Sequence, residues 1–572
     1  MKNREIADIF SQMADLMEIL GEDRFRVNSY RKAGRTVQEL AEPIEEVAAA
    51  GKLEDIPGIG RSTAAKINQY LQTGKVEAHQ ELLAKVPAGV AAMLKVGGLG
   101  PKTAAKLWKE GGITTVEQLK AALSDPQKLE GISGIGPKKA QQLLESLEFA
   151  EKVSGRSLLG EAQELAEALV AAVEAAKGAQ RVEIAGSLRR GKETIGDIDL
   201  LCQAGAKAAG KIIAAFTSAP AVQRVLAAGG TKGSVVLEGG TQADIRVVDR
   251  KSFGSALMYF TGSKDHNVAL RELAIKRGLK LSEYGLFKGD KQVAGADEEE
   301  VYKALGLAFI APELREERGE IQAAVKGKLP KLLRLEDIHG DMHMHTNASD
   351  GLNSIEEMIQ ACRDRGYAYM VISDHSKSQI QAHGLDENRL ASQIEQVKAA
   401  AKRFKDIAVL TGVEVDIFKD GSLDFGPDVL GELDFVTASP HSALSQGAEQ
   451  ATKRLLRAIE QRCVHCIGHP SGRLINARAG MELDIEAIAK AAAANDVALE
   501  INADPHRLDL RDVHVRVAVE AGAKLVISTD AHSIASLGLM RYGVMTARRG
   551  WATAKDVINT YSLAELRKWL RR

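Results

Sequence analysis

The 572-residue sequence contains only four cysteines and no apolar run near the roughly 20 residues that a membrane-spanning helix needs. The scarcity of cysteine excludes a scaffold built on disulfides and favours a reducing compartment. The opening "MKNREIADIF" has no apolar stretch of the kind found in secretory signals. We therefore expect a soluble cytoplasmic protein with no membrane partner.

An excess of charge of one sign is also lacking. The 76 Lys and Arg stand against 77 Asp and Glu, so charge alone does not indicate a nucleic-acid partner. Histidine is unevenly spread, because eleven of the thirteen lie at or after residue 339. The chain is too long for one ordinary domain, so several cores are expected. The histidines indicate that metal chemistry belongs to the C-terminal part.

Up to about residue 150 the apolar residues recur at helical spacing, with three similar interruptions. "PGIGRSTAAK", "GGLGPKTAAK" and "SGIGPKKAQQ" each place a G-x-G turn before a lysine-containing helix start. Glycine adopts conformations closed to other residues, and the free N–H groups of a helix start attract phosphate. A plain turn between helices is the alternative, but the repetition favours helix-hairpin-helix contacts with a DNA backbone. The candidate DNA-binding residues are Gly58, Gly60, Gly98, Gly100 and Lys102.

Between residues 151 and 315 strands and helices are mixed. "GSLRRGKETIGDIDLL" joins a glycine turn with two arginines to a strand carrying Asp197 and Asp199, which face the same side. With Asp244 of "QADIRVV", these carboxylates can hold the two divalent ions used in phosphoryl displacement. A lone D-x-D is more often a solvated strand face. Beside the arginine-bearing glycine turn, it predicts binding of a triphosphate.

These motifs, together with "YFTGSKDHN", resemble the palm and thumb of family X DNA polymerases, the polymerase beta type. The resemblance covers about residues 1–315. It implies template-directed synthesis from dNTPs on gapped or nicked DNA, with Mg²⁺ or Mn²⁺ held by the catalytic residues Asp197, Asp199 and Asp244. The nucleotide-binding residues that it implies are Ser187, Arg190, Gly196, Tyr259, Phe260, Gly262, Asn267 and Arg271.

Some members of this family also remove a 5′-deoxyribose phosphate through a Schiff-base lysine. Lys66, on the helix after the first hairpin, aligns with that lysine. Ser62 stands where those members have a nearby basic residue, which weakens the electrostatic support. A lyase nucleophile and an exposed helix lysine without chemistry are both open interpretations of Lys66.

After residue 339 strands and helices alternate, which predicts a parallel β/α architecture. Seven apolar strands are expected near "DMHMH", "MVISDH", "VLTGVE", "FVTASPH", "CIGHP", "ALEIN" and "LVISTDAH". In closed β/α barrels the carboxyl ends of the strands carry the active site, and six of the seven supply His, Asp or Glu there. Imidazole mixed with carboxylate suits Mn²⁺, Zn²⁺ or Fe²⁺. The candidate ligands are His343, His345, Asp350, His375, Glu414, His441, His469, Asp530 and His532.

This region resembles a PHP domain, the polymerase-and-histidinol-phosphatase family of phosphoesterases. That family folds as a distorted (β/α)7 barrel with up to three metal ions, and all nine ligands have counterparts here. Asp341 and Asp374 are expected to orient imidazoles. The lone CxxC of "CVHC" (463–466) lacks the second pair of a zinc knuckle, so no separate zinc site is expected. Fused in this order, the two regions resemble the family X polymerases of bacteria and archaea that carry a PHP domain, which implies a monomer in a bacterial or archaeal cytoplasm.

The motifs predict the order of the domains. A charged helix within 313–338 is expected to link two independent halves, so that a chain ending near residue 315 should polymerise without hydrolysing. The expected boundaries are an N-terminal helical domain with the first hairpin at 1–90, a fingers-like helical domain at 91–150, the palm at 151–255, the thumb at 256–315, the linker at 316–335 and the PHP domain at 336–572.

The expected function is gap filling in base-excision-type DNA repair. The PHP domain would act as a metal-dependent 3′–5′ exonuclease, with AP endonuclease or 3′-phosphodiesterase activity. One alternative is a small-molecule phosphatase of the histidinol-phosphatase type tethered to DNA, and another is a non-catalytic scaffold that binds DNA ends. The complete carboxylate trio opposes the first alternative, and the complete ligand set opposes the second.

Overall fold

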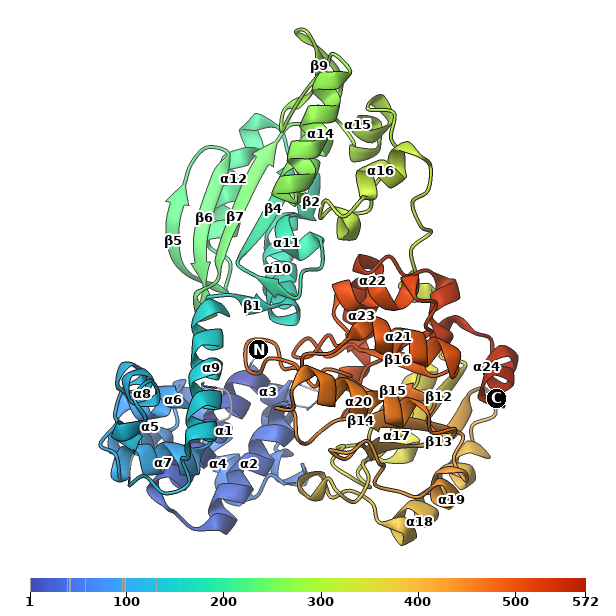
Figure 1. Cartoon of the computed structure of the whole chain (residues 1–572). Helices are drawn as coiled ribbons and strands as arrows, with labels where there is room; N and C mark the ends of the chain where they lie inside the picture. The colour runs from blue at the N-terminus through green and yellow to red at the C-terminus, as the bar shows by residue number, and fades with distance from the viewer. Residues whose placement is uncertain are drawn as a thin grey trace.

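The computed structural model describes residues 2–571 except 39, 41, 42, 57, 95, 97, 98, 130 and 154. Figure 1 shows a helical region, a mixed sheet with further helices, and a β/α barrel, coloured in chain order. In the described part of the chain, no helix is both long and apolar enough to pass through a membrane.

The helical region forms one apolar cluster that runs from Ile6 to Leu147. Its helix starts follow the predicted glycine turns. Gly60 and Gly100 are the N-caps of α4 and α7, and Gly136 directly precedes α9. Gly98 lies outside the described residues. The helices are α1 (Lys2–Leu20), α2 (Arg24–Gln38), α3 (Ile44–Ala49), α4 (Arg61–Thr73), α5 (Glu77–Lys85), α6 (Ala88–Met93), α7 (Pro101–Lys109), α8 (Val116–Leu123) and α9 (Pro137–Val153).

The α9 helix leads to a five-stranded sheet of order β2-β4-β7-β6-β5, in which β4 and β7 run parallel and the other neighbours antiparallel (Figure 1). Helices α10 and α12 pack on this sheet. The elements are β1 (Ser157–Leu158), α10 (Leu159–Glu174), β2 (Arg181–Ile184), α11 (Gly186–Arg189), β3 (Thr194–Ile195), β4 (Asp197–Gln203), α12 (Ala206–Thr217), β5 (Val222–Ala228), β6 (Lys232–Leu237) and β7 (Gln242–Val248).

A smaller α/β unit follows, with a three-stranded antiparallel sheet of order β10-β9-β8. Its elements are α13 (Phe253–Thr261), α14 (Lys264–Lys276), β8 (Lys280–Ser282), β9 (Gly285–Lys288), β10 (Lys291–Ala294) and α15 (Glu298–Ala304). The prediction of a linker helix within 313–338 is wrong, because α16 (Glu320–Val325) is the only α-helix that the described residues form there. Two charged residues of this segment are buried in ion pairs instead of facing solvent: Arg315 bonds Glu298 at 2.6 Å, and Glu320 bonds His266 at 2.6 Å.

The C-terminal region confirms all seven predicted strands. They form one parallel sheet in sequence order, and a parallel bridge between Met344 and Ala531 nearly closes it into a barrel. The strands are β11 (Gly340–Asp341), β12 (Tyr369–Ile372), β13 (Ala408–Asp416), β14 (Phe435–Ser439), β15 (Cys466–Ile467), β16 (Ala498–Asn502) and β17 (Leu525–Ser528). The helices are α17 (Ile355–Asp364), α18 (Glu387–Ala401), α19 (Pro427–Leu430), α20 (Ala448–Ile459), α21 (Ile485–Ala494), α22 (Asp512–Glu520), α23 (Met540–Arg549) and α24 (Leu563–Leu570).

The barrel shares apolar packing with the five-stranded sheet. Ile475, Leu508 and Tyr542 of the barrel belong to the same buried cluster as the sheet's own core. Trp551 packs in the same way against the core of the smaller α/β unit. The two halves of the chain are therefore joined by buried side chains and not by a loose tether.

Candidate active sites

The first site lies where β4 and β7 run side by side. Asp199 stands opposite Asp244 in the register, and Asp197 begins β4. Asp244 accepts hydrogen bonds from Ser234 Oγ at 2.6 Å and Gln242 Nε2 at 2.7 Å. An open pocket of about 350 Å³ is lined by Gly186, Ser187, Arg190, Asp197, Asp199, Tyr259, Phe260, Gly262, Lys264, Asn267 and Arg271.

This pocket gathers most of the predicted polymerase residues from separate segments. Of the predicted set, Asp244 and Gly196 do not line it. Asp244 lies beside Asp199, and a Cβ on Gly196 would meet the guanidinium of Arg156 at 3.0 Å. Lys264 lines the pocket but was not predicted. Its position inside "YFTGSKDHN", directly after the turn assigned to the sugar, is the signal that could have identified it.

The carboxylates of this site are crowded. Burial, followed by the charges of Asp197 and Asp244, raises the pKa of Asp199 to about 7. Gly186 has a φ of 63°, and a Cβ there would lie 2.5 Å from Asp199 Oδ2. Divalent cations would relieve the repulsion among these carboxylates, and oxygen ligands suit Mg²⁺ and Mn²⁺. The residues therefore fit the two ions that the family resemblance implies.

The raised pKa of Asp199 predicts a pH-dependent cost in stability. Its folded pKa of about 7 exceeds the ordinary value, so the metal-free protein loses stability as the pH rises from about 4 to 7, and the full cost persists above that. Asp199→Asn removes the cost. We expect Asp199→Asn to raise the free energy of unfolding by on the order of 2 kcal/mol at about pH 8, a value kept modest because partial exposure screens the charge. The gain should shrink toward about pH 5, where Asp199 is protonated in the folded protein. Denaturant unfolding in EDTA measures it, and an equal gain at both pH values would contradict it.

Arg190, the predicted triphosphate ligand, is held from two sides. Its Nε donates to Glu316 at 3.0 Å, and its NH1 donates to the carbonyl of Thr261. Arg549 of α23 donates to the carbonyl of Arg190 at 2.6 Å and to Glu316 at 3.0 Å, while Asp512 accepts its other N–H groups. Glu316 and Arg549 lie beyond residue 315. The structure thus places supports of the polymerase pocket outside the segment expected to polymerise by itself.

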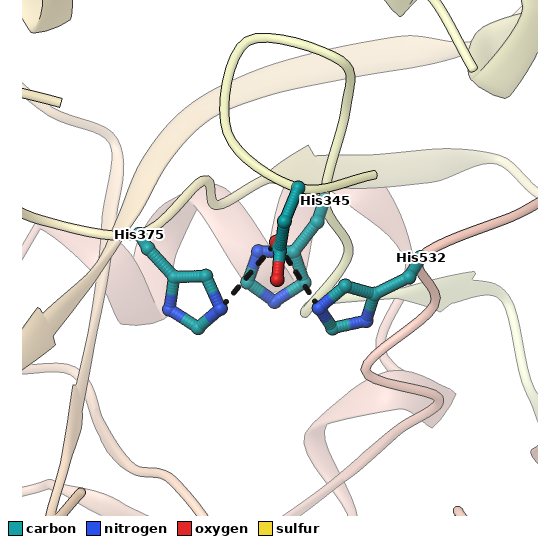
Figure 2. Close-up of side chains that lie close together, drawn as sticks. His345, His375 and His532 are labelled. Carbon is teal, nitrogen blue, oxygen red and sulfur yellow. Dashed lines mark ion pairs between the residues drawn. The ribbon is translucent and has the colours of Figure 1, made fainter. Parts of the chain in front are cut away.

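The second site lies at the carboxyl ends of the barrel strands, as predicted. Three groups of side chains have ligand atoms within 4.8 Å of one another, and Figure 2 shows His345, His375 and His532 converging from three separate segments. His469, the ninth predicted ligand, lies outside these groups with its Nε2 2.9 Å from Glu414. The groups are His345, Asp350, His375 and His532; His343, His345 and Asp530; and His375, Glu414 and His441.

The bonding and charge of this cluster fit metal ions. Ring nitrogens of His343, His345 and His469 are buried and have no hydrogen-bond partner among the described residues, which is rare for buried polar atoms. Burial acts to lower the pKa of His441, yet Glu414 and Asp416 raise it to about 10. Burial and the neighbouring imidazoles lower the pKa of His345 to about 3, which keeps its ring in the neutral form that binds metal.

Two of the ligands lie in a strained backbone conformation. His469 has a φ of 24° and Asp530 a φ of 51°, values that non-glycine residues rarely adopt. Such conformations cost about 1–3 kcal/mol each and persist where the surrounding structure enforces them, typically at active sites. The strain at two of the nine ligands is consistent with a site built for function.

The carboxylates that orient the imidazoles differ from those expected. Asp341 and Asp374 do not bond an imidazole ring; Asp341 accepts from Thr529 and the His343 backbone, and Asp374 from Thr346, Ser349 and Gln393. The ring-orienting carboxylates are instead Glu500 and Asp416. Glu500 bonds His343 Nδ1 at 2.8 Å and the backbone N–H of His469 at 2.5 Å, and Asp416 bonds His441 Nδ1 at 2.6 Å.

Glu500 therefore offers a test of the metal centre. Glu500→Gln puts an amide N–H group beside the donors of His343 and His469. We therefore expect metal affinity and the rate of hydrolysis to fall by about 10- to 100-fold, while primer extension is unchanged. Metal analysis of the purified protein measures the first effect. Asp434→Asn is the matched control, because that carboxylate bonds Thr411 at 2.9 Å next to the start of β14. Equal metal content in Glu500→Gln and the wild type would contradict the prediction.

Lys66 lies in a pocket of about 470 Å³ in the helical region, together with Phe25, Arg26 and Lys85. Its Nζ bonds Ser62 Oγ at 3.0 Å and lies 5.6 Å from the centre of the Tyr30 ring. Of the two further cations in this pocket, Arg26 pairs with Glu22 at 2.6 Å, and Glu81 also lines the pocket. Among the hairpin residues, Gly58 has a φ of 97° and Lys102 is 80% exposed.

Comparison with protein-family models gives five matches along the chain. They are the Helix-hairpin-helix domain at 1–76, the SAM-like Helix-hairpin-helix tandem at 90–148, the DNA polymerase beta palm at 159–229, the DNA polymerase beta thumb at 256–316 and the PHP domain at 341–504. The order of these matches follows the order predicted from the motifs.

Three curated relatives cover different parts of the chain. DNA polymerase lambda of Arabidopsis thaliana is 27% identical over 55% of this chain and 62% of its own. A probable phosphatase of Shewanella piezotolerans is 29% identical over 35% of this chain and 79% of its own. The DNA polymerase/3′-5′ exonuclease PolX of Bacillus subtilis is 38% identical over 100% of both chains. With the palm, thumb and PHP matches, this full-length similarity shows that the chain belongs to the PolX family of DNA polymerases, the family X enzymes that carry a PHP domain.

Proposed function

We propose that the protein fills short gaps in DNA during base-excision-type repair and that its barrel removes nucleotides from 3′ ends. One observation carries this proposal: a single chain holds a carboxylate trio beside a pocket of about 350 Å³ and, separately, a cluster of possible metal ligands in the barrel. The PolX relative, whose name states both activities, matches over the full length. Gapped DNA and dNTPs are the proposed substrates. A chain of this length with only four cysteines fits the reducing cytoplasm that we propose as the location.

In the polymerase pocket, Ser187 and Arg190 bind the triphosphate, and the turn from Tyr259 to Gly262 contacts the sugar. Asn267 and Arg271 line the side where the new base pair forms. Asp197, Asp199 and Asp244 would hold Mg²⁺ or Mn²⁺, which supplies charge neutralisation for phosphoryl transfer when bound. Asp244 also accepts the proton of the primer 3′-hydroxyl. Glu316 keeps the Arg190 guanidinium in place through the 3.0 Å bond to its Nε.

In the barrel, the nine ligands would hold up to three ions, for which we propose Mn²⁺, Zn²⁺ or Fe²⁺. When bound, these ions supply charge for the scissile phosphate and activate water near neutral pH. Glu500 and Asp416 fix the ring positions of His343 and His441. We extend this proposal to cleavage at abasic sites and of 3′-phosphodiesters, since the bond hydrolysed is of the same kind.

A second candidate is hydrolysis of small phosphate monoesters, favoured by the similarity to a probable phosphatase. One assay separates the candidates. The protein is incubated with labelled gapped DNA, dNTPs and Mg²⁺ or Mn²⁺, and in parallel with p-nitrophenyl phosphate. We expect both extension and shortening of the labelled strand, with slow release of p-nitrophenol. Rapid release without any shortening would support the phosphatase instead.

For the helical region we propose backbone contacts with DNA through Gly58, Gly60, Gly98, Gly100 and Lys102, and lyase chemistry through Lys66. The cations around Lys66 would bind a 5′-phosphate and place its sugar next to the amine. Borohydride reduction of the protein mixed with DNA carrying a 5′-deoxyribose phosphate should trap a covalent adduct that Lys66→Ala lacks. An adduct of equal yield in Lys66→Ala would remove this role.

A further inference from the structure

A groove of about 670 Å³, here called the α20 groove, lies between α20 and the turn that follows β13. Phe418 and Ser442 are among its lining residues. Ser442 directly follows His441, and Phe418 comes two residues after Asp416, the carboxylate that bonds His441 at 2.6 Å. Two lining residues of the groove are therefore close along the chain to a candidate ligand and to the carboxylate that orients it.

The lining of the α20 groove combines positive charge with an aromatic ring. Lys419, Lys453, Arg454 and Arg457 face one carboxylate, that of Asp420. The ring of Phe418, next to these cations, is 37% exposed, although large apolar side chains elsewhere in the barrel are mostly buried. A basic wall beside an exposed aromatic face is the combination that binds single-stranded nucleic acid.

Arg454 is a buried residue that lines the α20 groove. Its side chain is 1% exposed, and its guanidinium donates to the carbonyls of Ser442, at 2.7 Å, and Ile417. Its Nε is buried and has no hydrogen-bond partner among the described residues. Buried donors are normally bonded, so the unbonded Nε is unusual for a buried guanidinium. Lys453 is paired with Glu449 on the helix surface, a weak contact that a phosphate can replace.

We propose that the α20 groove binds the DNA strand whose 3′ end enters the metal centre. Bases behind the terminal nucleotide stack on Phe418, and their phosphates lie along Lys419, Lys453 and Arg457. The proposal rests on the exonuclease activity proposed above and adds the subsite that distinguishes a DNA strand from a small phosphate ester. A phosphatase of small esters has no use for a charged groove of this size beside its metal ions.

The test compares substrates of different length. For single-stranded oligonucleotides of about 2 to 12 nucleotides in Mn²⁺, kcat/KM of the wild type is expected to rise with length until the groove is filled. Phe418→Ala should lower kcat/KM for the long substrates by about tenfold or more, and Phe418→Trp should restore most of it. Lys453→Ala should weaken the salt dependence. Thymidine 5′-(p-nitrophenyl phosphate) has no strand behind its terminal nucleotide, so its hydrolysis should be unchanged in every variant.

The controls separate the possible failures. Lys490→Ala is matched to Lys453→Ala, because Lys490 pairs with Glu486 on α21 in the same i,i+4 geometry at 2.5 Å. Unchanged metal content shows that the variants are folded. If Phe418→Ala and Lys453→Ala equal the wild type at every length, the α20 groove is not a DNA subsite, although the exonuclease assignment stands. If the wild type shortens no oligonucleotide but hydrolyses p-nitrophenyl phosphate, the exonuclease assignment itself is wrong.

Discussion

Asp197→Ala is expected to lower primer extension by on the order of a thousandfold and to leave 3′ shortening within about twofold. Asp197 lines the polymerase pocket beside Asp199 and Asp244, so its removal leaves too few carboxylates for two ions. The barrel ligands lie on other strands and share no residue with this set. Extension and shortening of one labelled gapped substrate, followed on the same gel, measure both effects.

Asp249→Ala is the matched control for this variant. Asp249 follows β7, is exposed, and accepts a hydrogen bond from the Ser252 backbone at 2.9 Å, outside the polymerase pocket. It should extend primers like the wild type. Robust extension by Asp197→Ala would remove the assignment of the polymerase carboxylates.

His345→Ala is expected to disable hydrolysis by the barrel. His345 belongs to two of the three ligand groups, so its loss damages two candidate ion positions at once. We expect 3′ shortening to fall by at least about a hundredfold and the bound metal to decrease, with primer extension unchanged. Shortening by the wild type should also respond to Mn²⁺ more than to Mg²⁺, because imidazole favours first-row transition ions while Mg²⁺ prefers oxygen ligands.

Metal analysis beside gel assays of both activities checks this prediction. His383→Ala is the control, since His383 is an exposed histidine of the same barrel outside the three ligand groups. A wild-type protein that binds no transition metal, or a His345→Ala variant with normal shortening, would reduce the histidine cluster to a structural feature.

The strand-end residues of the barrel were predictable because two local rules agree. An apolar run marks each buried strand, and a ligand-type residue at its carboxyl end marks the active-site rim of a barrel. Glu500 escaped this reasoning because it lies within the apolar run "ALEIN" and not after it. A fully buried carboxylate inside such a strand is itself a signal, since it must have a partner. Asp416 was missed because the predicted strand ends at Glu414, whereas the observed strand continues for two more residues and ends at Asp416.

Contacts between distant segments could not be predicted in the same way. The charged segment around Glu316 has the composition of a solvated linker, and nothing in its own sequence indicates that Arg190 and Arg549 bond it. Local patterns report on neighbours along the chain, whereas this contact joins residues more than a hundred positions apart. The pairing of Asp199 with Asp244 was easier to predict, because both strands carry recognisable motifs.

The buried side chains that join the two halves affect how a DNA 3′ end can move between the two sites. Ile475, Leu508 and Tyr542 of the barrel are part of the polymerase sheet's core, and Arg549 is bonded to the backbone of Arg190. A barrel anchored in this way cannot swing toward a primer held in the polymerase pocket without breaking that core. A 3′ end that is to be trimmed would then have to leave the polymerase pocket and cross the protein surface to reach the metal cluster. The balance between primer extension and 3′ shortening would then depend on how readily the end of the duplex unpairs.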